Sequence, residues 1–110
     1  MSRVVVTGGS GRLGRNLVAG LAAFGHEVVS LDRAPSDDLR IDGVEQISID
    51  LLDAAATAET LVRAKADSLV HLAAIAVPFS APEDVIMRTN TGLAVSVLGG
   101  AVDAGIGRIV

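Results

Sequence analysis

The chain has 110 residues, of which 50% are hydrophobic and 2% aromatic, with a formal net charge of −4 and no cysteine. This length suggests one domain at most, with a core of small and branched aliphatic side chains. The acidic balance argues against nucleic acid and anionic membranes as partners, and the lack of cysteine excludes disulfides and thiolate metal sites. No apolar run approaches the ~18 residues of a membrane span, so we expect a soluble, cytoplasmic protein and assign no metal ligands.

The first third of the chain alternates between strand and helix patterns. Three successive valines in residues 3–7 favour a buried strand. From residue 11 onward, apolar side chains recur at helical spacing, namely Leu13, Leu17, Leu21 and Phe24. Gly25 can end this helix as its C-cap, and residues 27–31 return to a valine-rich strand.

The middle of the chain repeats this alternation after a surface loop. Residues 35–43 are polar and rich in turn-forming residues, so we expect a loop there. Residues 45–49 alternate apolar and polar side chains and predict a third strand. Asp53 can then cap a helix that runs to about residue 66.

The last third predicts a strand, a loop and one long helix. Residues 69–72 form the fourth expected strand, and the two prolines of the next ten residues mark a loop. A helix is expected over roughly residues 83–104, ended by Gly105, and "GRIV" has the pattern of the start of a fifth strand. This alternation predicts an α/β protein with a Rossmann-type, doubly wound parallel sheet.

Three of the glycines in "VVVTGGSGRLG", spaced three residues apart, lie at the junction of the first strand and the first helix. Gly8 can adopt the backbone angles of a sharp turn, Gly11 leaves room for a pyrophosphate, and Gly14 lets the helix approach the strand. The N–H groups around Arg12 and Leu13 would then point toward the anion. The pattern predicts a dinucleotide-binding loop, and the alternative is a tight strand–helix turn without a ligand.

Asp32 ends the second strand, where a carboxylate can accept hydrogen bonds from the ribose diol of an adenosine. The alternative is an exposed carboxylate at the end of a strand. The negative charge of Asp32 would repel the 2′-phosphate of NADP, which favours NAD as the cofactor. Arg33 can instead receive that phosphate, and Arg12 can either reach a phosphate or lie exposed at the helix start.

Several segments together resemble the extended short-chain dehydrogenase/reductase family, and more narrowly its NAD-dependent epimerase/dehydratase branch. They are "TGGSGRLG", "LDR", "DLLD", "HLAA" and "NTGLAVSVLGGAVDAGIGRIV". The resemblance spans the whole chain and implies contacts of Asp50 and Leu51 with adenine. It further implies that Leu72, Ala73, Ala74 and Ala76 line the cofactor, and that Asn90 supports the active site. Without the resemblance, Asp50 can cap the next helix, and Asn90 can face solvent.

Proteins of this family use a tyrosine, a lysine four residues later and a serine or threonine upstream of the tyrosine. The present chain contains no tyrosine, and its only lysine, Lys65, falls in the second predicted helix. We therefore assign no catalytic residue, and we interpret His71 as a structural histidine rather than a catalytic one. We expect residues 1–110 to be the N-terminal, cofactor-binding part of a longer protein, inactive without its catalytic and substrate-binding parts.

The resemblance implies an epimerase, dehydratase or dehydrogenase that acts on a sugar-like substrate, such as a nucleotide sugar or a uronic acid. Other small hydroxy compounds are alternative substrates. The same residues are compatible with two alternative functions: a non-catalytic sensor of dinucleotides, and an interaction module that keeps only the fold.

The long helix suggests a further partner, because residues 89–102 contain no charged side chain. One stripe, formed by Leu93, Val97 and Ala104, can cover the sheet, yet the other faces are also apolar. Two adjacent glycines, Gly99 and Gly100, suggest a close neighbour. By resemblance we expect a homodimer through the helix at residues 83–104, with Ala94, Leu98 and Ala101 at the interface. The alternative is that another part of the same chain covers this face.

Overall fold

The computed structural model describes residues 2–110 and has the predicted doubly wound architecture. Within these residues, one parallel sheet has the strand order β3-β2-β1-β4-β5. The strands are β1 (Arg3–Thr7), β2 (Glu27–Asp32), β3 (Val44–Ser48), β4 (Ser68–His71) and β5 (Arg108–Ile109). The helices are α1 (Arg12–Ala23), α2 (Ala54–Ala64) and α3 (Glu83–Asp103), with the short 3-10 helix η1 (Asp37–Leu39).

The strand and helix types agree with the sequence prediction, and the differences lie at the ends of elements. The third and fourth strands begin one residue earlier than predicted, at Val44 and Ser68. Helix α2 ends at Ala64 instead of near residue 66, because Lys65 adopts a left-handed conformation with φ of 49°. The predicted loop at 35–43 contains η1, whose Leu39 is 1% exposed and anchors it against α1.

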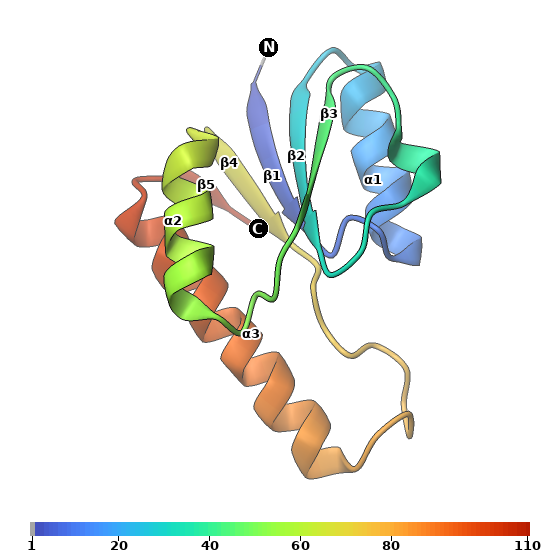
Figure 1. Cartoon of the computed structure of the whole chain (residues 1–110), viewed down its shortest axis with the longest axis vertical. Coiled ribbons are helices and arrows are strands. Elements are labelled where there is room, and N and C mark those ends of the chain that lie inside the picture. Colours follow the sequence, from blue (N-terminus) through green and yellow to red (C-terminus); the bar gives the residue numbers. More distant parts are fainter. Residues whose placement is uncertain (1) are drawn as a thin grey trace.

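Helices cover both faces of the sheet (Figure 1), and a hydrophobic core lies under the helices of each face. Helix α1 covers one face, and α2 and α3 together cover the other. Neighbouring residues of β1 show the alternation that this requires: Val5 belongs to the core under α2 and α3, whereas Val4 and Val6 belong to the core under α1. Asp53 caps α2 as predicted, since its carboxylate accepts a hydrogen bond from the Ala56 N–H at 3.1 Å.

The long helix α3 packs against the sheet through part of the predicted stripe. Val97 is fully buried in the core, and Leu93 and Ala104 pack against it. Ala101 is also 0% exposed, so its predicted place on a face between two copies is wrong. Ala101 lies one helical turn after Val97, on the same side of α3, and both belong to the core between α3 and the sheet.

The two glycines of α3 have different surroundings. A Cβ atom at Gly100 would lie 3.1 Å from Leu61 and 3.5 Å from Ala58, so the close neighbour inferred from sequence is α2 of the same chain. Nothing lies within 4 Å of the corresponding position at Gly99. Helix α3 is also long and apolar enough to cross a membrane, with a mean hydropathy of 1.3. The sequence-based expectation that no apolar run approaches the length of a membrane span is therefore wrong for this helix. In this structure 22% of that stretch is buried, on the side where α3 packs against α2 and the sheet.

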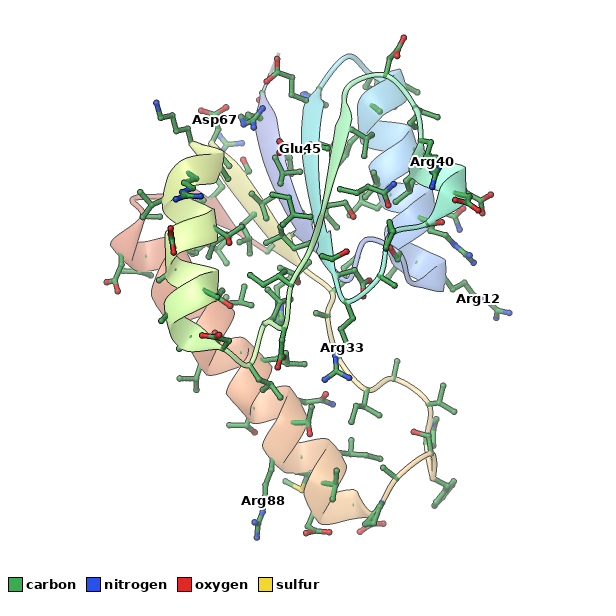
Figure 2. The ribbon with its side chains drawn as sticks, in the orientation of Figure 1. Arg12, Arg33, Arg40, Glu45, Asp67 and Arg88 are labelled. Atoms are coloured by element: carbon green, nitrogen blue, oxygen red, sulfur yellow. The ribbon has the colours of Figure 1, made fainter. Side chains whose placement is uncertain are left out.

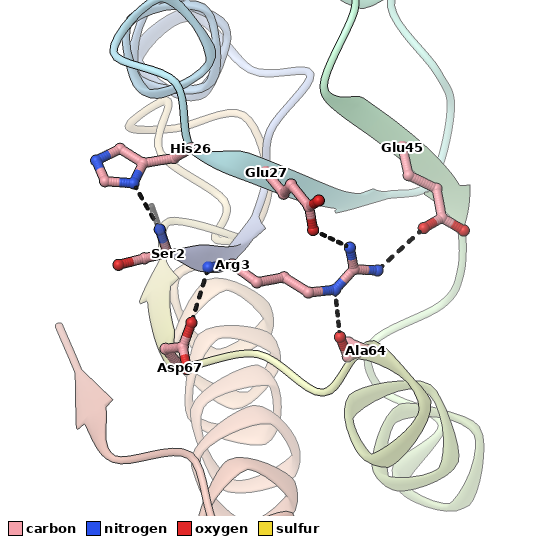
Figure 3. A network of polar contacts seen from close by, with 7 residues as sticks. All are labelled: Ser2, Arg3, His26, Glu27, Glu45, Ala64 and Asp67. Carbon is pink, nitrogen blue, oxygen red and sulfur yellow. Dashed lines mark hydrogen bonds and ion pairs between the residues drawn. The ribbon is translucent and has the colours of Figure 1, made fainter.

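Arg3 ties the amino ends of three strands to the end of α2 (Figure 3). Its guanidinium donates to Glu27 at 3.0 Å, to Glu45 at 3.5 Å and to the carbonyl of Ala64. Its backbone N–H donates to the Asp67 carboxylate at 2.9 Å. This edge of the sheet is therefore held together by groups of the chain itself.

Candidate functional site

A cavity of about 1160 Å³ lies at the carboxyl edge of the sheet, opposite the Arg3 network. Its walls come from the glycine loop, the segments after β2 and β3, the segment after β4, and α3. Most residues predicted from sequence line it together: Gly8, Gly11, Arg12, Leu13, Gly14, Asp32, Arg33, Leu51, Leu72, Ala73, Ala74 and Ala76. Asp50 and Asn90 are not among the lining residues.

The glycine loop has the close approaches that its spacing predicted. Gly8 has a φ of +71°, and a Cβ atom there would lie 2.8 Å from the Ala73 nitrogen. A Cβ atom at Gly14 would lie 2.1 Å from the Gly8 carbonyl oxygen, so helix α1 can start here only without a side chain. At Gly11 the nearest atom is the same oxygen at 3.3 Å, and the remaining space belongs to the cavity.

The start of α1 leaves backbone donors available at the cavity. Gly11 is the N-cap, no side chain caps it, and the first turn contains no acidic residue. The first N–H groups of a helix have no partner within it and carry the positive end of the helix dipole. The N–H groups at the start of α1 can therefore bind a phosphate in the cavity.

Asp32 lies at the end of β2 with its carboxylate oriented by two backbone donors. Oδ2 accepts from the Ser10 N–H at 3.0 Å, and Oδ1 accepts from the Arg33 N–H at 2.7 Å. Each carboxylate oxygen can accept a further hydrogen bond. The side chain is thus fixed at the cavity wall and can still accept from a ligand hydroxyl.

The two candidate arginines differ in direction (Figure 2). Arg33 extends from the end of β2 toward the segment after β4, whereas Arg12 extends away from the body of the protein. Both nevertheless line the cavity. Arg12 is exposed at the helix start, as its alternative reading expected, and its contact with a phosphate stays a prediction.

Thr7 joins the ends of β1 and β4 beneath the cavity. Its buried Oγ1 accepts from the N–H groups of Leu72 at 3.0 Å and Ala73 at 3.2 Å, and it lies 2.7 Å from His71 Nδ1. A neutral His71 with its proton on Nε2 can accept the Thr7 hydroxyl proton at Nδ1, and Oγ1 can then accept from both N–H groups. Burial lowers the pKa of His71 from its ordinary value of 6.5, which favours the same neutral form. This contact agrees with the structural role predicted for His71.

Asn90 holds the segment after β4 from the side of α3. Its Oδ1 accepts from the Ile75 N–H at 2.7 Å, and its Nδ2 donates to the Ile75 carbonyl at 3.2 Å. The side chain is therefore engaged with the chain and does not simply face solvent. Its predicted support of the active site would act through Ile75, which lines the cavity.

Asp50 and Leu51 have separate roles in the folded chain. The Asp50 carboxylate accepts from the Leu52 N–H at 3.0 Å, which forms a local turn, while Asp53 caps the helix. Leu51 is 4% exposed and contributes both to the core and to the cavity wall. Contact of these two residues with adenine stays a prediction.

Sequence reasoning missed several residues of the site. Gly9 is required for packing, since a Cβ atom there would lie 1.9 Å from Ser30 Oγ. Thr7 precedes the first glycine directly, so its position next to the motif was the available signal. Three further lining residues, Ser10, Leu52 and Leu93, lie inside the quoted segments but were given no cofactor role. The lining residues outside those segments include Ala34, Pro35, Ser36, Ile49, Ile75 and Thr89. Among residues 2–110, no group of three or more histidine or acidic side chains is placed to hold a metal ion.

Residues 4–110 match the NAD dependent epimerase/dehydratase family. The chain is 33% identical over 108 residues to a 2-alkyl-3-oxoalkanoate reductase of Stenotrophomonas maltophilia, which covers 98% of this chain and 32% of that protein. Two similar solved structures are WbmG of Bordetella bronchiseptica in complex with NAD and the UDP-glucose 4-epimerase of Thermus thermophilus in complex with NAD. The first is 26% identical with a TM-score of 0.84 and covers 98% of this chain and 36% of that one. The second is 27% identical with a TM-score of 0.85 and covers 97% of this chain and 36% of that one. The chain thus spans about a third of the length of these relatives.

Proposed function

The chain belongs to the NAD-dependent epimerase/dehydratase family, and we propose that it binds NAD at the carboxyl edge of its sheet as the cofactor-binding part of an oxidoreductase. One observation carries this proposal. The glycine loop, with the uncapped start of α1, and the oriented carboxylate of Asp32 line a single cavity. That pair supplies donors for a pyrophosphate and an acceptor for a ribose diol, which are the two polar features of a bound NAD.

The position of the cavity suggests how NAD would lie in it. The pyrophosphate would meet the N–H groups at the start of α1, between the ends of β1 and β4 where the strand order reverses. The adenosine would extend toward Asp32, and the nicotinamide would extend toward the segment after β4. Bound there, the nicotinamide can exchange a hydride with a substrate carbon. The residues of this chain would bind and orient the cofactor and exclude water from one side of it.

The chain itself contains no tyrosine to exchange a proton with a substrate. We therefore propose that it binds the cofactor and does not turn over substrate without further catalytic groups. The reading as a dinucleotide-sensing regulator is not favoured, because the family and the similar proteins are oxidoreductases and epimerases.

For the substrate we propose a sugar-like molecule, as the resemblance to nucleotide-sugar enzymes implied. The similar Thermus protein is a UDP-glucose 4-epimerase, which supports this proposal. A second candidate is an apolar carbonyl compound. Residues 72–82 contain no charged side chain, and Val77 and Phe79, which follow the cavity-lining Ala76 in the chain, are 65% and 91% exposed. The similar reductase that acts on 2-alkyl-3-oxoalkanoates supports this alternative.

The two substrate classes can be compared on the NAD-loaded chain by amide NMR. UDP-glucose is expected to shift resonances of residues 75–81, where the substrate would border the nicotinamide. Shifts there with a 2-alkyl-3-oxo acid and none with UDP-glucose would contradict the sugar proposal and favour the apolar substrate.

We also propose a homodimer through α3, with an interface corrected by the structure. Val95, Leu98 and Val102 form one exposed stripe, with exposed fractions of 70%, 38% and 67%. Their spacing places them on one side of the helix, next to the open space at Gly99. Leu98→Glu should yield monomers in sedimentation at micromolar concentration, because a carboxylate would be buried without a partner. A variant that remains dimeric would show that any dimer uses another surface.

The cofactor proposal is tested by calorimetric titration of the unmutated chain with NAD. We expect saturable binding of one NAD per chain. The absence of any saturable heat or NMR shift would contradict the proposal.

A further inference from the structure

Residues 33–36 form the cavity wall next to Asp32 and connect β2 to η1. All four of them line the cavity, and the segment has no helix or strand of its own. A short segment without secondary structure has few internal contacts to hold its position. Here its backbone is held from two sides by polar side chains of other elements.

Gln46 of β3 holds this wall from behind. Its Oε1 accepts from the Ser36 N–H at 2.8 Å, and its Nε2 donates to the Ser36 carbonyl at 3.0 Å. The amide thus satisfies both backbone polar groups of one residue and can do so in one orientation only. Gln46 does not itself line the cavity, so it acts on the wall and does not touch a ligand there.

Ser10 of the glycine loop holds the same wall from the other side. Its Oγ donates to the Ala34 carbonyl at 2.7 Å, and its N–H donates to Asp32 at 3.0 Å. Segment 33–36 is consequently fixed relative to Asp32 and the glycine loop at one point and relative to β3 at another. The wall cannot move outward unless one of these ties breaks.

We propose that Gln46 is a positioning residue that sets the preference for NAD over NADP, by fixing segment 33–36 at the spacing that suits an adenosine ribose without a 2′-phosphate. This inference rests on the proposed binding of NAD in the cavity. A 2′-phosphate would add volume and negative charge beside the Asp32 carboxylate, and a wall tied on both sides cannot withdraw to admit it. Once the tie to Ser36 is lost, the segment can move outward, and the Arg33 side chain can turn toward the phosphate.

The test is the ratio of NAD affinity to NADP affinity in Gln46→Leu, which removes both hydrogen bonds to Ser36 at similar side-chain volume. The ratio should fall roughly three- to tenfold, the range expected for losing one or two hydrogen bonds. A role limited to the stability of the fold would weaken both cofactors by the same factor and leave the ratio unchanged. An unchanged ratio, whether or not the variant binds both cofactors more weakly, would overturn the proposal.

Glu45→Leu is the matched control on the same strand. Its side chain points to the opposite face of the sheet, where it pairs with Arg3 at 3.5 Å. This variant should weaken the fold without changing the ratio of the two affinities. If Glu45→Leu lowers the ratio as much as Gln46→Leu does, the proposal is overturned. The effect would then come from any change in β3 and not from the contact with Ser36.

Gln46→Glu keeps the test decisive if the leucine variant fails to fold. Ionised, the introduced carboxylate can accept from the Ser36 N–H but opposes the Ser36 carbonyl. Protonated, it reproduces the donor and acceptor pattern of the original amide. The Ser36 carbonyl and partial burial both disfavour the charged form, so the pKa of the introduced carboxyl should lie above the ordinary value of about 4.3. The ratio should therefore be reduced at about pH 7.5 and recover at about pH 4, each measured relative to the unmutated chain at the same pH.

A ratio in this variant that does not respond to pH would overturn the proposal. If the unmutated chain binds neither cofactor, the proposed function itself fails. If that chain prefers NAD and the Gln46 variants keep its ratio, only the positioning role fails.

Discussion

The two edges of the one parallel sheet are built in opposite ways. At the amino edge, the Arg3 guanidinium meets two carboxylates and a helix-terminal carbonyl, and its backbone N–H meets a third carboxylate (Figure 3). At the carboxyl edge, Gly11 has no side chain to fill the space, and a helix N-terminus and the Asp32 carboxylate face a large cavity. The charges of one edge are paired within the chain, whereas polar groups of the other edge retain capacity for a ligand.

This difference separates stability from binding along the same strands. Residues of the amino edge contribute to the folded state, and their loss should cost unfolding free energy. At the carboxyl edge, the residues leave a cavity unfilled and backbone donors without partners. They contribute to stability mainly when a ligand is bound there. Variants at the two edges should therefore affect different measurements.

The largest effect is expected for Gly11→Val at the carboxyl edge. The branched side chain would extend into the space where the pyrophosphate approaches, so NAD binding should be abolished. Circular dichroism should still show most of the secondary structure, because only the Gly8 carbonyl lies within 4 Å of the added Cβ atom. An unchanged calorimetric titration would show that this loop is only a turn.

A smaller effect is expected for Asp32→Ala. The variant should bind NAD about tenfold more weakly, because a charged acceptor of the ribose diol is lost. Binding of NADP should fall less, because a charge that repels its 2′-phosphate is lost as well. Equal affinity of the unmutated chain for both cofactors would contradict the role assigned to this carboxylate.

The amino edge gives the converse result in Arg3→Met. Losing the guanidinium contacts should lower the free energy of unfolding by about 1 kcal/mol, a modest value because the paired carboxylates are half exposed. Denaturant titration measures this change, and NAD affinity should stay within about twofold. A large loss of NAD affinity at unchanged stability would remove the distinction between the edges.

The smallest effect concerns His71 and pH. Burial lowers the pKa of His71 in the folded chain, so the unfolded chain takes up this proton first as the pH falls. The stability that the neutral ring contributes is present above about pH 6.5 and is lost as the pH falls through the lower folded value. His71→Asn keeps an acceptor for the Thr7 hydroxyl and should flatten this part of the stability profile. An unchanged profile would contradict the assignment.

The fold and the centre of the site could be predicted from sequence, because both depend on local patterns. Valine runs and helical periodicity indicated the element order. The spacing of Gly8, Gly11 and Gly14 indicated a specific turn from strand to helix. The ends of elements were less accurate, since they depend on single conformations such as the left-handed Lys65.

The other parts of the site depend on contacts between distant residues. Gln46 and Ser36 meet only because β3 lies beside β2 in the sheet, and no motif marks either residue. Ala101 was misplaced because every face of α3 is apolar, so composition could not tell the buried face from the exposed one. Periodicity discriminates poorly between helix faces in residues 89–102, because that stretch has no charged side chain to mark the exposed face.

The most direct test of the central claim is an amide NMR titration of the unmutated chain with NAD. The account predicts shifts at the glycine loop 8–14, at residues 32–36 and at residues 72–76, with no shifts around Arg3 and Glu45 at the other edge. Shifts concentrated at the amino edge, or none at saturating NAD, would contradict it.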